Sequence, residues 1–163
     1  MRPAVKIADL TDSLAMVSPE STAWLDRATG RVWIIENGVM AVAEGDSIDE
    51  DELSDWHEDE LAAARALLSE SDRGIELPTA FDFHEYRHME RFIGTLPASS
   101  AADQLWRAVK GRGAFRHFKD TAHRLGVLDA WYAYRDDALR QFMLRWARAH
   151  NIPVDESPGR AGP

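Results

Sequence analysis

The chain contains no cysteine in its 163 residues. This absence excludes disulfide bonds, thiolate metal sites and cysteine nucleophiles, and it suits a protein of the reducing cytoplasm. The sequence also has no apolar run of membrane-spanning length, and charges at Arg2, Lys6 and Asp9 interrupt its first ten residues. Because signal peptides and membrane helices need such a run, we expect a cytoplasmic protein with no membrane partner.

The composition is that of a folded protein. Hydrophobic residues make up 45% of the chain and include six tryptophans. A chain of this length buries about two-thirds of its surface on folding, so it needs neither a metal nor a disulfide to be stable. We expect one domain over residues 1–152 with no cofactor, and a disordered tail over residues 153–163, where proline and glycine accumulate.

Lysine and arginine are scarce in the first half of the chain. Residues 1–80 contain 18 acidic and 6 basic side chains, whereas residues 81–163 contain 10 acidic and 13 basic ones. The most acidic stretch, residues 44–60, has ten Asp or Glu at its seventeen positions. The net charge of −9 therefore hides an asymmetry, and an anionic partner would be repelled by the first half and attracted to the second.

Hydrophobic periodicity predicts an α+β fold. Residues 7–17 have the spacing of an amphipathic helix, and strand-forming residues dominate at 22–27 and 31–36, on either side of a glycine-containing loop. A turn at Asn37-Gly38 would lead into a third strand at residues 39–43. A helical pattern follows with an acidic start near residues 55–60 and continues through Leu68, and further ones lie at residues 82–94, 100–111, 113–125 and 128–149. We expect a small N-terminal antiparallel hairpin or three-stranded sheet packed with a predominantly helical C-terminal half.

Residues 84–88 match the zinc-enzyme motif H-E-x-x-H. In that motif two histidines one helical turn apart, here His84 and His88, bind zinc, and the glutamate, Glu85, activates the metal-bound water. The position of a third histidine in the extended motif holds Gly94, and both histidines share a helix face with Arg91, which is typical of a solvated surface. A metal-dependent hydrolase is therefore an alternative, while the main interpretation has no metal site.

The segment from Gly111 to Leu139 is the candidate working surface. Two glycines flank Arg112, and between residues 105 and 125 six Lys or Arg accompany a single acid, Asp120. Four potential cations recur at intervals of four, three and four residues, which places them along one side of a helix: Arg112, Arg116, Lys119 and His123. A second side carries apolar residues and is expected to be buried: Phe115, Phe118, Ala122 and Leu125.

Two interpretations of these cations are open. They could bind an external anion, assisted by the positive end of the helix dipole, or they could neutralise carboxylates of residues 44–60 within the same chain. In the next helix Tyr132 is suited to contact a ligand, and Arg135 lies near the apolar side, where it needs a partner such as Asp120 or Asp136. The candidate ligand-binding residues are Gly111, Arg112, Gly113, Arg116, Lys119, Tyr132 and Arg135.

These motifs resemble those of the bacterial uncharacterised protein family UPF0158. The resemblance rests on G-R-G-A-F-R at residues 111–116, F-K-D at 118–120, L-G at 125–126 and W-Y-x-Y-R-D-x-A-L at 131–139. The first helix, the hairpin at residues 25–30 and Leu77-Pro78 also fit, so the resemblance extends to about Ile152. It implies no established activity, substrate or catalytic residues, and it favours the Gly111 segment over the H-E-x-x-H motif.

We therefore expect a small binding module without catalytic residues, rather than an enzyme. Its partner would be an anionic small molecule or an acidic protein, recognised through residues 111–119. Nucleic acid is the less favoured anion, because the net charge is −9 and no nucleic-acid-binding motif is present. A purely structural module, whose basic stripe closes on its own acidic stretch and whose surface serves protein association, is the remaining alternative. The sequence predicts no oligomeric state.

Overall fold

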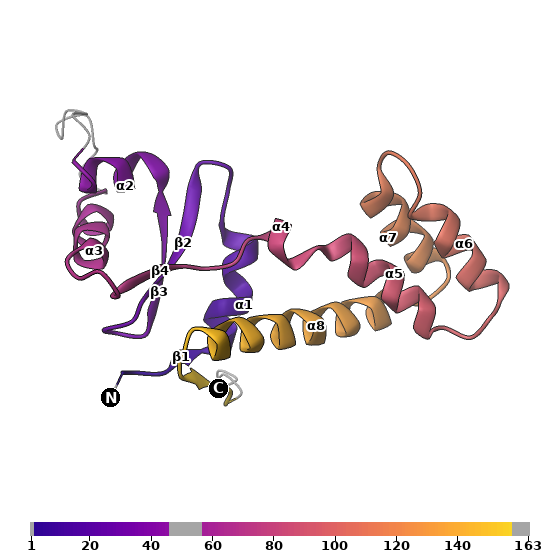
Figure 1. The fold of residues 1–163 in the computed structure, drawn as a ribbon. Helices are drawn as coiled ribbons and strands as arrows, with labels where there is room; N and C mark the ends of the chain where they lie inside the picture. The colour runs from indigo at the N-terminus through magenta and orange to yellow at the C-terminus, as the bar shows by residue number, and fades with distance from the viewer. Residues whose placement is uncertain (1, 46–56, 158–163) are drawn as a thin grey trace, which may run out of the picture. The chain divides into compact units, whose positions relative to one another are not determined.

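The structure is a computed structural model that describes residues 2–45 and 57–157 of the chain. It divides into two compact units. Figure 1 shows the elements of both, coloured by residue number. Residues 1–79 and 143–163 form one unit, which we call the split unit, and residues 80–142 form the inserted unit. Helix α8 (Leu128–Ala149) contributes residues to both.

The split unit contains a three-stranded antiparallel sheet. Strands β2 (Ser21–Asp26) and β3 (Arg31–Glu36) form the predicted hairpin, and β4 (Gly74–Glu76) pairs with the other edge of β2. In the loop between β2 and β3, Gly30 has a φ of +76°, and a Cβ atom there would lie 2.8 Å from the carbonyl oxygen of Ala4. Glycine is therefore required at this position both for the backbone conformation and for the close approach of the N-terminal segment.

The predicted third strand at residues 39–43 is wrong, because these residues belong to helix α2 (Asn37–Ala43). Asn37-Gly38 opens this helix instead of turning a hairpin. The helical conformation turns three side chains of α2 into a core that it shares with β3 and with α3 (Glu58–Leu68). That core consists of Ile35, Val39, Met40, Val42, Leu61, Ala64 and Leu67, with Trp24 and Trp33 packed against it.

A buried ion pair fixes the end of the β2–β3 hairpin. The carboxylate of Asp26, which is 4% exposed, accepts hydrogen bonds from Nε and Nη2 of Arg73 at 2.9 and 3.0 Å and from the backbone N–H of Ala28 at 2.9 Å. Burial raises the pKa of Asp26, but the hydrogen bonds from Arg73 and Ala28 and the charge of Arg73 together outweigh burial and lower it. The carboxylate is therefore held in its ionised form.

The first strand, β1 (Val5–Lys6), pairs in parallel with the last strand, β5 (Val154–Asp155). Helix α1 (Ile7–Met16) follows β1 directly and buries Leu10 and Ser13. The predicted disordered tail starts too early, because residues 154–155 form β5 and pair with β1. Residues 158–163 lie outside the described part of the chain.

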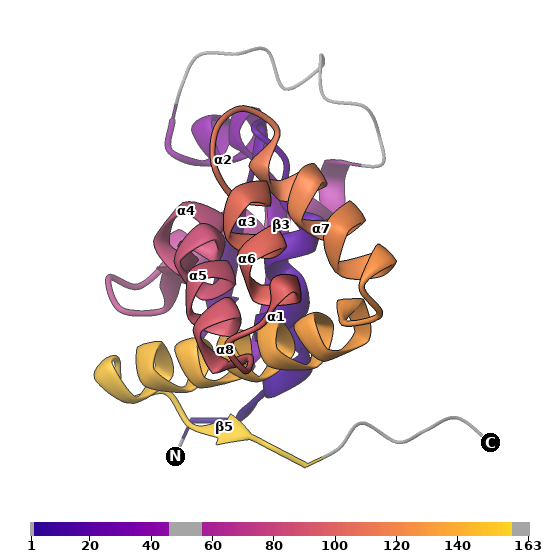
Figure 2. The same ribbon diagram turned by 90° about the vertical axis from the view of Figure 1, so that its right-hand side faces the viewer.

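The inserted unit is helical. It contains α4 (Ala80–Phe83), α5 (Glu85–Thr95), α6 (Ser100–Ala108), α7 (Ala114–Arg124) and the first part of α8. Helix α6 packs against both α5 and α7 (Figure 2). Their shared core consists of Met89, Phe92, Ile93, Ala102, Leu105, Val109, Phe118, Ala122 and Trp131.

The fold is α+β, with an antiparallel three-stranded sheet and a predominantly helical C-terminal half, as the sequence predicts. Among the helices of the described residues, none combines the length and the apolar character that a membrane span requires.

Candidate functional site

The turn between α6 and α7 presents Arg112 to solvent. Gly111 and Gly113 both adopt the left-handed conformation, with φ of +85° and +72°, and the chain reverses between the two helices within these few residues. Residues other than glycine adopt this backbone conformation only at an energetic cost, so the two glycines determine the shape of the turn. Arg112, which stands between them, is exposed.

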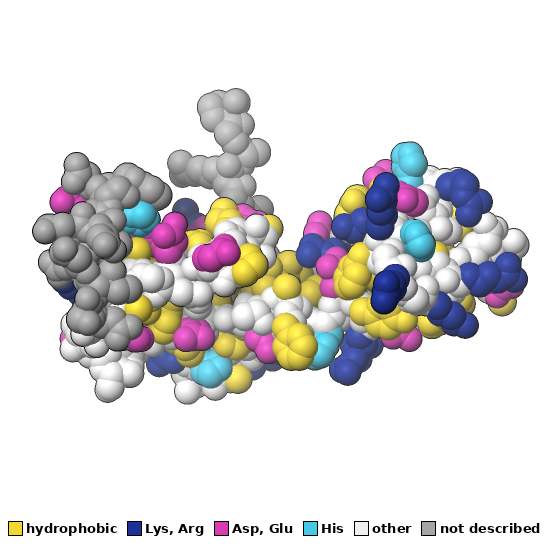
Figure 3. Space-filling view, turned by 90° about the horizontal axis from the view of Figure 1, so that it is seen from above, with side chains coloured by type: hydrophobic (Ala, Val, Ile, Leu, Met, Phe, Trp, Pro, Cys, Tyr) yellow, Lys and Arg dark blue, Asp and Glu magenta, His cyan; other side chains and the backbone are white. Residues whose placement is uncertain are grey.

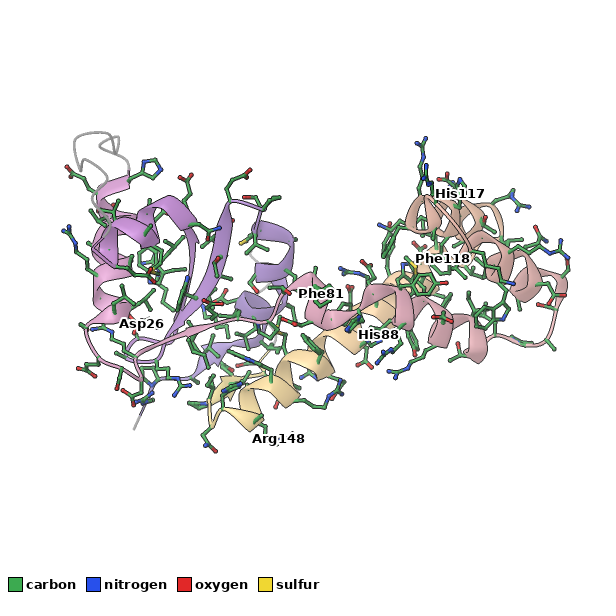
Figure 4. The ribbon with its side chains drawn as sticks, turned by 45° about the horizontal axis from the view of Figure 1, so that its top comes forward. Asp26, Phe81, His88, His117, Phe118 and Arg148 are labelled. Atoms are coloured by element: carbon green, nitrogen blue, oxygen red, sulfur yellow. The ribbon has the colours of Figure 1, made fainter. Side chains whose placement is uncertain are left out.

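Helix α7 buries one face and exposes the opposite one. Its buried residues are Ala114, Phe118 and Ala122, which recur every four residues. Figure 4 shows the contrast at two neighbouring positions, where Phe118 points into the helical core and His117 points away from it. Arg112 lies in the turn before α7 and not on the helix, where the sequence predicted it, whereas Arg116, Lys119 and His123 fall outside the buried row because the helix turns about 100° per residue. We call Arg112, Arg116, Lys119 and His123 the basic face.

The basic face has little internal charge compensation. The side chain of Arg116 is 88% exposed, and its Nε lies 3.9 Å from Oδ2 of Asp120, which is itself 73% exposed. An exposed pair of this kind contributes little to stability. Within residues 2–45 and 57–157, no salt bridge joins Arg112 or Lys119 to a carboxylate. Residues 46–56 of the acidic stretch lie outside the described part, so their predicted pairing with the basic face stays a prediction.

Exposed aromatic side chains accompany these cations. Phe115, which the sequence analysis placed in the buried row, is 45% exposed, and Trp106 on α6 is 37% exposed. The small side chain of Ala114 occupies the inward position at the start of α7, which turns Phe115 outward. Figure 3 shows Lys and Arg side chains gathered with hydrophobic ones over the part of the inserted unit that carries α6 and α7.

Arg135, a candidate ligand-binding residue, is engaged within the inserted unit. Its Nε lies 2.5 Å from Oε1 of Glu85 on α5, whereas the predicted partner Asp136 is 3.9 Å from Nη1. Glu85 is 50 residues away in the sequence, so no local pattern could have indicated it. This ion pair ties the start of α5 to α8. Tyr132 remains available to a ligand, because its side chain is 42% exposed.

The H-E-x-x-H segment does not have the geometry of a zinc-binding helix. His84 lies before the start of α5 in the left-handed conformation, with φ of 55° and ψ of 63°, and is exposed. His88 is 8% exposed and stacks on Phe83 with ring centroids 4.4 Å apart, so its predicted surface position is wrong. In the described part of the chain, no three His, Cys, Asp or Glu side chains are grouped so that they could hold a metal ion.

Comparison with known proteins identifies one family. The model of an uncharacterised protein family, UPF0158, matches residues 1–156, which confirms the resemblance seen in the sequence motifs. No curated protein and no solved structure gives a significant match to the chain.

Proposed function

We propose that this chain, which belongs to the uncharacterised protein family UPF0158, is a binding module that recognises an anionic partner through the basic face of α7. The observation that carries the proposal is the exposure of Arg112 and Arg116, of which Arg116 forms only a long, exposed ion pair with Asp120. Charged side chains left without partners on one face attract and steer ligands of opposite charge.

The local backbone supports this role. Gly111 and Gly113 fix the turn that carries Arg112, and the buried row of Ala114, Phe118 and Ala122 fixes the rotation of α7. The cations are therefore displayed by a packed helix and a defined turn, which lowers the entropy that a ligand must remove on binding. Arg135 holds α5 against α8 through Glu85 and is assigned a positioning role.

The proposal is tested by measuring the affinity for heparin, a polyanion with no base or peptide chemistry. The double variant Arg112→Ala/Lys119→Ala removes two cations of the basic face, and we expect it to elute from immobilised heparin at lower salt than the wild type. The matched control is Arg145→Ala/Arg148→Ala, which removes the same charge from exposed positions on α8.

The comparison between the two double variants decides the outcome. A basic-face variant that elutes earlier than the α8 variant supports the proposal, because the two proteins have the same net charge. If both variants elute at the same salt concentration, the attraction depends only on total charge and the proposed site is rejected.

A further inference from the structure

We infer that the anionic partner of the basic face is a single-stranded nucleic acid, and that Phe115 stacks on one of its bases. The inference rests on the proposed function, since it names the partner of the same surface. It rests on a second observation, the exposure of aromatic side chains among the cations. Sequence-independent single-strand binding combines these two features, a positively charged surface that follows the phosphates and aromatic side chains on which bases stack.

Phe115 lies at the edge between the buried row of α7 and its cations. At about 100° per residue, Phe115, Lys119 and His123 follow one flank of the outer surface of α7, and Arg116 lies next to them. Asp120, Arg124 and His117 lie on the opposite flank, so the only acid of α7 is turned away from Phe115. The ring of Phe115 remains 45% exposed beside these cations, so part of it is open to a ligand.

Helix α6 adds a second aromatic side chain and further positive charge. Trp106 is 37% exposed, and Arg107 and Lys110, which follow it closely in the chain, are both exposed. Because α6 packs against α7, these side chains belong to the same helical pair as the basic face. Aromatic and basic side chains on two adjacent helices can contact successive nucleotides of one strand.

The dimensions of the surface set the expected length of the strand. Phe115 and His123 are eight residues apart, which corresponds to about 12 Å along the helix axis. At about 3.4 Å per nucleotide of a stacked strand, this flank accommodates about four nucleotides.

The same features argue against the other polyanions. An acidic peptide could neutralise the cations but offers no base on which Phe115 and Trp106 could stack. A duplex presents a regular phosphate backbone, but its base faces are covered by the stack, and exposed aromatic side chains gain nothing from it. A single strand satisfies both the charge and the aromatic surface.

The test separates the contribution of the bases from that of the phosphates. Fluorescence anisotropy would measure binding of a labelled 12-nucleotide oligothymidylate, of an abasic oligonucleotide of the same length, of a 12-base-pair duplex and of a 12-residue polyglutamate. Each ligand would be titrated with the wild type, with Phe115→Leu, which removes the aromatic ring, and with Phe115→Tyr, which keeps one. Circular dichroism melting would confirm that both variants fold.

We expect oligothymidylate to bind the wild type at least about fivefold more tightly than the abasic strand, as one base-stacking contact predicts. Phe115→Leu should abolish this difference and Phe115→Tyr should preserve it. Equal binding of the two strands, tighter binding of the duplex, or equally tight binding of polyglutamate would overturn the inference while leaving anion recognition intact. If no polyanion binds at low salt, both the inference and the proposed function are rejected.

Discussion

Single residues at the end of the β2–β3 hairpin show how the split unit is held together. Asp26 is almost fully buried and receives two hydrogen bonds from Arg73. Arg2 forms the contrasting pair with Asp72, in which the two side chains are 43% and 60% exposed. Buried charges whose hydrogen bonds are complete are costly to separate, whereas exposed pairs contribute little.

The lowered pKa of Asp26 predicts a pH dependence of stability. A carboxyl whose pKa is lower in the folded state stabilises the fold above its unfolded pKa, about 3.9, and this contribution is lost as the pH falls through the folded value. We expect Asp26→Asn to lower the free energy of unfolding by about 2 kcal/mol at pH 7, since it removes charge-assisted hydrogen bonds. As the pH falls below about 4, the variant should lose less stability than the wild type does, because it has no carboxylate to protonate at this position. Urea unfolding between pH 7 and pH 3 measures both effects.

The matched control for this prediction is Asp72→Asn. This substitution also removes a carboxylate that is paired with an arginine, but at an exposed position, so its effect at pH 7 should be clearly smaller. If the two variants lost the same stability, burial would not be what makes the Asp26 ion pair important.

Comparing Gly30 with Gly126 separates the backbone strain of adding a side chain from the steric clash that the side chain causes. Both have a φ of +76°, but a Cβ atom at Gly30 would lie 2.8 Å from the Ala4 carbonyl oxygen, whereas nothing lies within 4 Å at Gly126. We expect Gly126→Ala to destabilise the protein by about 1 kcal/mol through backbone strain alone. Gly30→Ala should cost more, because the N-terminal segment must also move. Urea unfolding of the two variants measures the difference, and equal losses would mean that the close approach carries no energetic weight.

At the scale of elements, helix α7 has one buried row that faces the core and one exposed surface. Phe118 is fully buried, while Phe115, three residues earlier, is 45% exposed. Phe118 also meets Trp131 at a centroid distance of 5.1 Å and Phe92 at 6.3 Å, both edge to face. Such aromatic contacts add to the stabilisation that burial provides.

The two phenylalanines of α7 therefore predict opposite outcomes. Phe118→Ala should destabilise the inserted unit by about 3–5 kcal/mol, because it removes a buried ring and leaves a cavity. Phe115→Ala should cost less than about 1 kcal/mol, as is usual for an exposed position. Urea unfolding followed by circular dichroism measures both. A large loss at Phe115 would show that its ring belongs to the core, which would also remove the basis for a stacking role.

The extent to which the sequence predicts the structure differs between elements. Helix α7 was predicted within one residue at each end, because two glycines and an apolar row mark it locally. Its apolar row was predicted correctly at Phe118 and Ala122, and only its first position is wrong, because Ala114 is buried there while Phe115 is exposed. At α2, Asn37-Gly38 is a strong local turn signal, but burial of Val39, Met40 and Val42 against α3 favours a helix.

The candidate site shows the same division between local and distant interactions. Arg112 and Arg116 are both exposed, but Arg112 lies in the turn before α7, so the helical spacing that the sequence indicated accounts for Arg116 alone. The engagement of Arg135 by Glu85 and the stacking of His88 on Phe83 were not predicted, because they depend on tertiary packing.

At the scale of the whole molecule, each unit has its own core and its own charge character. The core of the split unit is built on the sheet and on α2 and α3, and that of the inserted unit on α5 to α8. Most of the acidic side chains lie in the first 80 residues, whereas the basic face and the exposed aromatic side chains of α6 and α7 lie in the inserted unit. The proposed recognition of an anion therefore concerns a compact unit that has a core of its own.

The pairing of β1 with β5 has a consequence for the order of events on the ribosome. Val5 and its partner Val154 are separated by nearly the whole described chain, including all of the inserted unit. At a synthesis rate of about 5–20 residues per second, β1 waits about 8–30 seconds for its partner to be made. All of the inserted unit is synthesised during that interval. Its helices can therefore begin to form before the two outermost strands are able to pair.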